Sequence, residues 1–330
     1  MDLGLIFGGL AVGIVVGLTG MGGGALMTPM LVFFFRVDPL VAIASDLVVS
    51  LVMKPAGAIV HLRRKTVNLQ LVKWLCLGSV PAAFAGAVLS QVLGKHDGFD
   101  AVLKIMLGIA LLIATAGLVV RAAISMVERR TPLGEGPARM SAPTSLSIKP
   151  VATVALGAVA GFVVGLTSVG AGSIIVVTLL LLYPSLKASQ LVGTDLVQAI
   201  PLVAAGAAGH LIFGEFTFDV AGSLVIGAIP GAWIGAQISS RAPGGIIRRA
   251  LAVLLLASGL KLLGVPTGWV LAAAVAALVL GNVAWMVFRR RMLTVDRARR
   301  AAGLVAGDHA ASAQAGLPVP DEEPPLTTRR

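Results

Sequence analysis

Two glycine-rich motifs interrupt apolar stretches of this chain, and both have the composition of an anion-binding turn. GLTGMGGG occupies residues 17–24 and GLTSVGAG occupies residues 165–172. Glycine destabilises a helix interior by about 1 kcal/mol relative to alanine, so each motif predicts a break between two half-helices. A half-helix that starts after such a turn presents unpaired N–H groups and the positive end of its dipole, which together suit an anion.

Hydroxyl side chains accompany both breaks and add hydrogen-bond donors. The candidate substrate-binding residues are therefore Thr19, Gly22, Gly23, Gly24, Thr167, Ser168, Gly170 and Gly172. Taken singly, either motif is also typical of small residues that let helices pack closely, and that alternative stays open. Because the break and its hydroxyls occur twice, we favour a substrate site at the middle of the membrane.

Two aspartates form a second matched pair, each several residues inside an apolar segment. They are Asp46 and Asp195, and they occupy equivalent places in the two halves of the sequence. An intramembrane carboxylate is costly and is by default a functional hypothesis, here a coupling residue that binds and releases a proton or ion. The alternative is that each carboxylate caps a helix near the membrane interface.

Four further polar residues are possible members of the site: Lys54, His61, Gln198 and His210. Lys54 either extends to the membrane surface or offers positive charge to an anion. The two histidines lie at matching segment ends and are typical of structural, hydrogen-bonded side chains. Gln198 follows Asp195 by three residues and is expected to share its helix face.

The composition places the chain in a lipid bilayer. Of its 330 residues, 57% are hydrophobic and 12% are charged, whereas soluble domains average about 45–50% and about 25%. The long continuous apolar segments predict membrane-spanning helices, hence an all-α polytopic fold. The net charge of +11 resides in loops and the C-terminal tail, which favours the positive-inside rule over nucleic-acid binding.

The sequence also argues against several classes of chemistry. Cys76 is the only cysteine, so neither an intramolecular disulfide nor a thiolate metal cluster is expected. We find no serine–histidine–aspartate set, no zinc-hydrolase motif and no phosphate-binding loop. The expectation is a protein that is not an enzyme and that needs no cofactor or metal.

The chain contains an internal duplication. VGLTGMGGGAL (16–26) matches VGLTSVGAGSI (164–174), and ASDLV (44–48) matches GTDLV (193–197). GSVPAAFAGA (78–87) likewise matches GAIPGAWIGA (227–236), and His61 matches His210. The offset is 148 residues at the first match and 149 at the other three. Four ordered matches predict two homologous halves, each with a glycine-broken hairpin or discontinuous helix plus three spans.

This organisation predicts five parts of the chain. They are a first transmembrane repeat (1–122), a cytoplasmic linker (123–150), a second transmembrane repeat (151–265), one additional C-terminal transmembrane helix (266–288) and a basic, then disordered cytoplasmic tail (289–330).

Loop charges predict that the two halves have opposite orientations. The loop at 63–73 carries four basic residues and no acid, so we place it in the cytoplasm. The acidic loop at 210–219 falls outside if segment 151–183 enters the membrane and returns to the same side. Apolar segments 25–35 and 173–183 are each 11 residues long, against about 20 for a crossing. Two short spans instead of a re-entrant hairpin remain possible, and an inverted-topology repeat follows in either case.

Across roughly residues 3–265, the GLTGMGGG opening, its echo GLTSVGAG and the GTDL-type segment resemble the TauE/SafE family of sulfite exporters. The resemblance implies a multi-pass permease of the bacterial inner membrane that carries sulfite, organosulfonates or related sulfur-containing or organic anions. We expect a secondary transporter, coupled to ions or protons, whose partners are a small anion and the lipid bilayer. A passive anion channel and an integral-membrane enzyme or accessory subunit are the alternatives, and a homo-oligomer is left open.

Overall fold

The structure is a computed structural model that describes most of the two repeats. It describes residues 2–19, 24–96, 98–128, 148–169, 171–183, 186, 188–214, 217–239, 244–283 and 286. Several expectations therefore lie outside the described residues: Gly22, Gly23, Gly170, the side chain of Thr19, most of the predicted linker and the tail from 289 onward.

The described residues form helices and short connections, with no strand among them. The helices are α1 (Leu3–Thr19), α2 (Gly24–Phe34), α3 (Pro39–Arg63), α4 (Leu69–Leu93), α5 (Phe99–Glu128), α6 (Pro150–Thr167), α7 (Ala171–Leu182), α8 (Ala188–Phe213), α9 (Phe218–Ser239) and α10 (Gly244–Leu262). A further apolar helix covers Thr267–Val283.

Six of the described helices are long and apolar enough to cross a membrane. They are Pro39–Arg63, Leu69–Leu93, Phe99–Val120, Pro150–Thr167, Gln190–Phe213 and Phe218–Gly235. Large apolar side chains such as Phe7, Leu77 and Trp233 remain more than half exposed on the outside of the helices. A bilayer is the solvent that accepts such a surface, so the chain is a multi-pass membrane protein.

Both predicted helix breaks are confirmed. Helix α1 ends at Thr19 and α2 begins at Gly24, while α6 ends at Thr167 and α7 begins at Ala171. At 11 and 12 residues, α2 and α7 are about 17 Å long, well short of a hydrocarbon core of about 30 Å. Among the described residues of the second break, Ser168 has a left-handed conformation (φ 59°).

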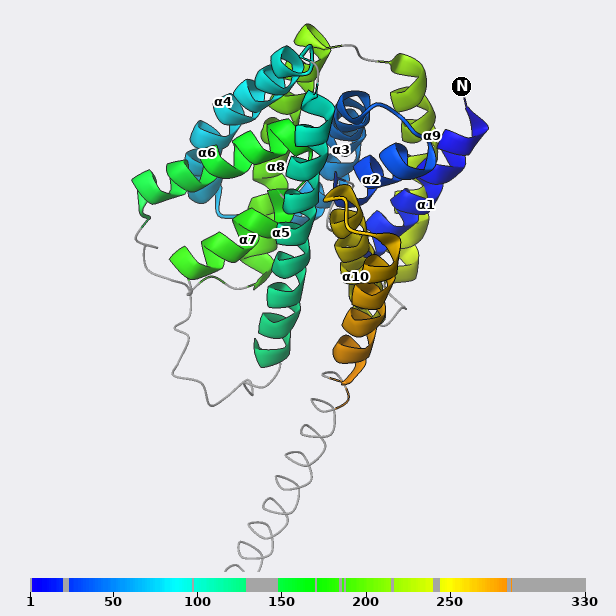
Figure 1. Cartoon of the computed structure of the whole chain (residues 1–330). Helices are drawn as coiled ribbons and strands as arrows, with labels where there is room; N and C mark the ends of the chain where they lie inside the picture. The colour runs from blue at the N-terminus through cyan, green and yellow to red at the C-terminus, as the bar shows by residue number, and fades with distance from the viewer. Residues whose placement is uncertain are drawn as a thin grey trace, which may run out of the picture. The chain divides into compact units, whose positions relative to one another are not determined.

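The helices of the two halves pack against each other reciprocally (Figure 1). Helix α1 runs along α9, and its counterpart α6 runs along α4. Helix α5 packs on its counterpart α10, and α3 on its counterpart α8. The first helix of each half therefore contacts the fourth helix of the other half, so the described fold is built across the duplication.

Glycines line the two reciprocal interfaces. A Cβ added at Gly13 of α1 would lie 2.5 Å from the Ala228 carbonyl oxygen of α9. In the other interface, a Cβ added at Gly161 would meet the backbone of Ser79. These helices approach backbone to backbone, as small residues allow in membranes. Gly165, the first residue of the second break motif, makes the same kind of contact with the Ala83 backbone of α4, so the packing alternative for the motifs stays open.

Alanine at Gly227 of α9 is expected to destabilise the folded protein. The added methyl group would overlap the Ile6 carbonyl and lie 2.8 Å from the Leu10 nitrogen, so α1 and α9 must separate. Overpacking of this kind costs about 1–3 kcal/mol. The melting temperature of the purified variant should fall relative to wild type.

Gly222→Ala in the same helix is the matched control, because a Cβ there has nothing within 4 Å. It gains helix propensity without a clash, so its melting temperature should stay level or rise. Equal melting temperatures for the two variants would contradict the backbone-contact interpretation.

Candidate functional site

The two helix breaks lie in direct contact. A Cβ built on Gly24, the first residue of α2, would overlap the carbonyl oxygen of Ser168 and lie 3.4 Å from its Oγ. Only glycine allows this approach, since any larger residue would push α2 away from the second break. The structure therefore brings GLTGMGGG of the first half into contact with GLTSVGAG of the second half.

A buried carboxylate occupies the same place. Asp46 of α3 has no exposed surface, and it accepts a hydrogen bond from the Thr28 hydroxyl of α2 at 2.9 Å. The Ser168 hydroxyl donates to the same oxygen, Oδ2. Ser50, one turn further along α3, donates to Oδ1 at 3.4 Å. We call Asp46, Thr28, Ser50 and Ser168 the Asp46 cluster.

Backbone geometry at the second break positions the Ser168 side chain. Ser168 follows the last residue of α6 in a left-handed conformation, and its N–H donates to the Val164 carbonyl at 2.6 Å. A residue with a Cβ rarely adopts this conformation, so its presence here marks a constrained position.

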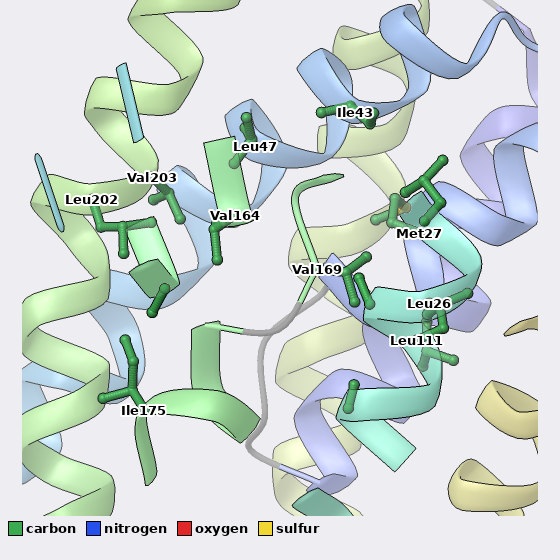
Figure 2. Packing of buried hydrophobic residues seen from close by; sticks show 14 of the residues in the cluster. Leu26, Met27, Ile43, Leu47, Leu111, Val164, Val169, Ile175, Leu202 and Val203 are labelled. Atoms are coloured by element: carbon green, nitrogen blue, oxygen red, sulfur yellow. The ribbon is translucent and has the colours of Figure 1, made fainter. Parts of the chain in front are cut away.

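Apolar side chains enclose this region (Figure 2). Val169, directly after Ser168, lies on the side of Leu26 and Met27 of α2, and Val164 lies on the side of Leu202 and Val203 of α8. All six belong to the buried hydrophobic cluster of the described residues. The polar groups of the Asp46 cluster are therefore surrounded by hydrocarbon, where charge is costly unless it is compensated.

The second aspartate has a different environment. Asp195 is 6% exposed in α8, and Lys54, which follows Asp46 by two helical turns in α3, attracts both carboxylates. The attraction to Asp195 is the larger of the two. Lys54, which is partly buried, is therefore a positive charge that attracts both aspartates.

Gln198 belongs to a separate polar contact between α8 and α4. Its Oε1 accepts a hydrogen bond from the Ser79 hydroxyl at 3.2 Å, and the Cys76 thiol approaches its backbone carbonyl at 3.9 Å. The fully buried Gln198 Nε2 has no hydrogen-bond partner within the described part of the chain, and neither does Ser45 Oγ.

Thr167 uses its hydroxyl proton within its own helix. Its Oγ1 donates to the Val163 carbonyl at 2.7 Å, while the Val169 N–H lies 3.3 Å from the same oxygen. Ser168 and not Thr167 is therefore the hydroxyl of the second break that reaches across to the other half. Gly172 lies in the first turn of α7, whereas Gly22, Gly23, Gly170 and the side chain of Thr19 lie outside the described residues.

The two histidines that match in the repeat have unlike partners. Both ring nitrogens of buried His210 are engaged, with Nε2 2.9 Å from the Gly165 carbonyl and Nδ1 2.7 Å from Gln91 Nε2. His210 thus fixes α8 to the residue that opens the second motif. His61 Nδ1 instead lies 2.9 Å from the Thr66 hydroxyl in the loop after α3.

Sequence reasoning missed Thr28 and Ser50. The Ser50 signal was available, since a hydroxyl four residues after an intramembrane aspartate lies on the same helix face. Thr28 gave no such signal, because the duplication places a valine, Val176 or Val177, at the equivalent position.

The oxygen-rich Asp46 cluster differs from a transition-metal site. Among the described residues, no group of three or more histidine, cysteine, aspartate or glutamate side chains could hold a metal ion. What the cluster offers is one carboxylate and three hydroxyls, a set that binds protons or hard cations and can donate hydrogen bonds to anions.

Comparison with known proteins agrees with this architecture. A family profile described as "Sulfite exporter TauE/SafE" matches residues 5–262. The probable membrane transporter protein YjnA of Bacillus subtilis (strain 168) is 37% identical over 264 residues, which covers 80% of this chain and 100% of the relative. No solved structure gives a significant match.

Two further relatives from the same organism are more distant. The probable membrane transporter proteins YunE and YdhB are 26% and 25% identical, covering 72% and 76% of this chain and 86% and 96% of their own lengths. The family match includes both helix breaks and both intramembrane aspartates. This chain therefore belongs to the sulfite exporter TauE/SafE family of membrane transporters.

Proposed function

We propose that this protein is a secondary transporter for a small oxyanion, driven by an ion or proton gradient. Sulfite, an organosulfonate or a related sulfur-containing or organic anion is the proposed substrate. The family name supports the sulfur-containing class, and the site supports an anion by its chemistry.

The observation that carries the proposal is the contact between Gly24 and Ser168. It places the N-terminus of α2, with N–H groups that lack intrahelical partners, beside the hydroxyl of the second break. Gly172 lies in the first turn of α7, which adds a second helix N-terminus of the same kind.

The charge of Asp46 gives a physical reason why binding of the anion would be coupled to binding of a cation or proton. An ionised carboxylate about 4 Å from a bound anion would repel it by about 4 kcal/mol at an effective dielectric constant of 20. The anion therefore binds well only when a cation or proton neutralises Asp46. Asp195 is the second candidate for this role, and the attraction of Lys54 to it already compensates part of its charge.

The proposed topology is an inverted repeat in the bacterial inner membrane, with a cytoplasmic C-terminal tail. The reciprocal pairs α1–α9 and α4–α6 support a two-fold relation between the duplicated units, and the inversion itself rests on the loop charges. Loop charges support the same orientation, with the basic loop at 63–73 inside and the loop at 210–219 outside.

Cysteine labelling in intact cells tests this topology. In a Cys76→Ser background, Arg64→Cys and Thr217→Cys place single thiols at exposed positions in the two loops. An impermeant thiol reagent should label Thr217→Cys from outside, and Arg64→Cys only after the membrane is opened. The Cys76→Ser protein alone controls for background, and labelling of both positions from one side would refute the inverted repeat.

Counterflow in proteoliposomes tests the substrate. Vesicles preloaded with sulfite, sulfate, thiosulfate, sulfoacetate or small carboxylates are compared for accelerated uptake of labelled anion. We expect acceleration by at least one sulfur oxyanion, and uphill accumulation under an ion gradient distinguishes a carrier from a passive channel. If none of these anions exchanges through folded protein, the anion assignment is wrong.

A further inference from the structure

We propose that the Asp46 cluster is a Na⁺ binding site, formed by the Asp46 carboxylate and the hydroxyl oxygens of Thr28, Ser50 and Ser168. The proposal deepens the proposed function by naming the coupling ion. Only the statement that Na⁺ drives anion transport rests on that function. The site itself can be tested without any anion.

The oxygens of the Asp46 cluster converge on one place, and two of their separations already match the ligand spacing of a hard cation. Ions such as Na⁺ and Ca²⁺ bind oxygen ligands at about 2.3–2.6 Å, which sets neighbouring ligands about 3.4 Å apart in an octahedral arrangement. The Thr28 and Ser168 hydroxyl oxygens are 3.4 Å apart, and Ser50 Oγ is 3.4 Å from Asp46 Oδ1. Thr28 Oγ1 is 2.9 Å from Asp46 Oδ2 and Ser168 donates to that same oxygen, so these two hydroxyls must move outward from Asp46 when a cation enters. Rotation of the hydroxyl hydrogens away from Asp46 turns all three oxygens into ligands.

Backbone charge at the second break also favours a cation. Ser168 directly follows the last residue of α6, where the final carbonyls of a helix lack partners and the dipole is negative. The Ser168 carbonyl oxygen is the nearest atom to a Cβ built on Gly24. Half-helix C-termini and unwound carbonyls coordinate Na⁺ in other transporters with broken helices.

The sequence does not repeat these three hydroxyl residues at the equivalent positions of the other half. The three hydroxyl positions around Asp46 correspond to Gly20, to Val176 or Val177, and to Ala199 in the other half. Around Asp195, the charged group is instead Lys54, whose attraction to Asp195 exceeds that to Asp46. The two equivalent aspartates therefore differ in the residues that the sequence supplies at these three positions.

Charge balance is compatible with a monovalent ion. Lys54 on α3 and Asp195 on α8 are the charged groups whose electrostatic effect reaches this region among the described residues. Their charges offset each other, which leaves the Asp46 carboxylate as the counter-charge for a single positive ion.

Binding of ²²Na⁺ to the purified full-length protein, without any anion, tests the proposal. Thr28→Val deletes one oxygen at constant shape, and Ser168→Gly deletes another while tolerating the left-handed conformation. We expect saturable binding of ²²Na⁺ to the wild-type protein, and we expect K⁺ at the same concentration not to displace it. Each variant should raise the Na⁺ Kd at least tenfold, and Asp46→Asn should abolish binding.

Ser45→Ala is the matched control, since it removes an adjacent buried hydroxyl that has no partner in the described residues. Its Na⁺ Kd should stay within twofold of wild type, and Thr28→Ser should restore the affinity lost in Thr28→Val. If Asp46→Asn does not fold, the threonine and serine variants still decide the question.

Absence of saturable Na⁺ binding by folded wild type overturns the proposal. Proton uptake or release at Asp46 without any Na⁺ effect overturns it as well, in favour of a proton site. Na⁺ binding that survives while no anion exchanges in counterflow would support the cation site and refute the anion transport function instead.

Discussion

Asp46→Asn is expected to abolish uphill accumulation of the anion in proteoliposomes while leaving part of the exchange between equal anion pools. The neutral amide removes the charge that repels the anion when Asp46 is ionised, so anion binding no longer depends on a cation. It also removes the group that a driving cation must occupy. Labelled anion uptake with and without an ion gradient measures both activities on the same vesicles.

Asp195→Asn provides the comparison for this result. Because Lys54 attracts Asp195 more strongly than Asp46, we expect Asp195→Asn to reduce transport without separating uphill uptake from exchange. Equal loss of both activities in correctly folded Asp46→Asn would indicate a structural role for the Asp46 cluster. Normal uphill transport by Asp46→Asn would remove Asp46 from the coupling mechanism altogether.

Gly24→Ala should reduce anion affinity and transport at least tenfold. The added methyl group overlaps the Ser168 carbonyl, so the N-terminus of α2 must withdraw from the second break. Displaced N–H donors lose hydrogen bonds to the anion, each contributing about 1.5–3 kcal/mol when the partner is charged. A tenfold change corresponds to about 1.4 kcal/mol, so loss of a single such bond is sufficient.

Gly57→Ala is the control for this variant, because a Cβ at Gly57 meets only Leu196 methyl groups at 3.6 Å or more. Alanine favours helix over glycine at both positions, so a propensity effect alone would stabilise both variants. Anion affinity is measured on purified protein whose melting temperature shows that it is folded. Wild-type affinity in Gly24→Ala would show that the contact between the breaks lies outside the anion site.

The sequence predicted correctly those features that depend on composition or on neighbouring residues in the chain. Apolar content alone requires a lipid environment, and glycines at 17–24 and 165–172 interrupt helices whatever surrounds them, so the ends of α1 and α6 were predicted correctly. The duplication was equally visible, because it is a property of residue order. The family was recognisable for the same reason, and the profile match over residues 5–262 confirmed it.

Tertiary structure decided what the polar side chains contact. Thr167 and Ser168 are neighbours with similar side chains, yet Thr167 bonds to its own helix while left-handed Ser168 donates to Asp46 from the other half. Asp46 and Asp195 occupy equivalent positions in the repeat. The residues around each aspartate depend on which helices pack together, and the sequence alone does not specify that packing. Hydrogen bonds between segments depend on packing, and here backbone contacts at glycines such as Gly24 and Gly161 set the distances at which those side chains meet.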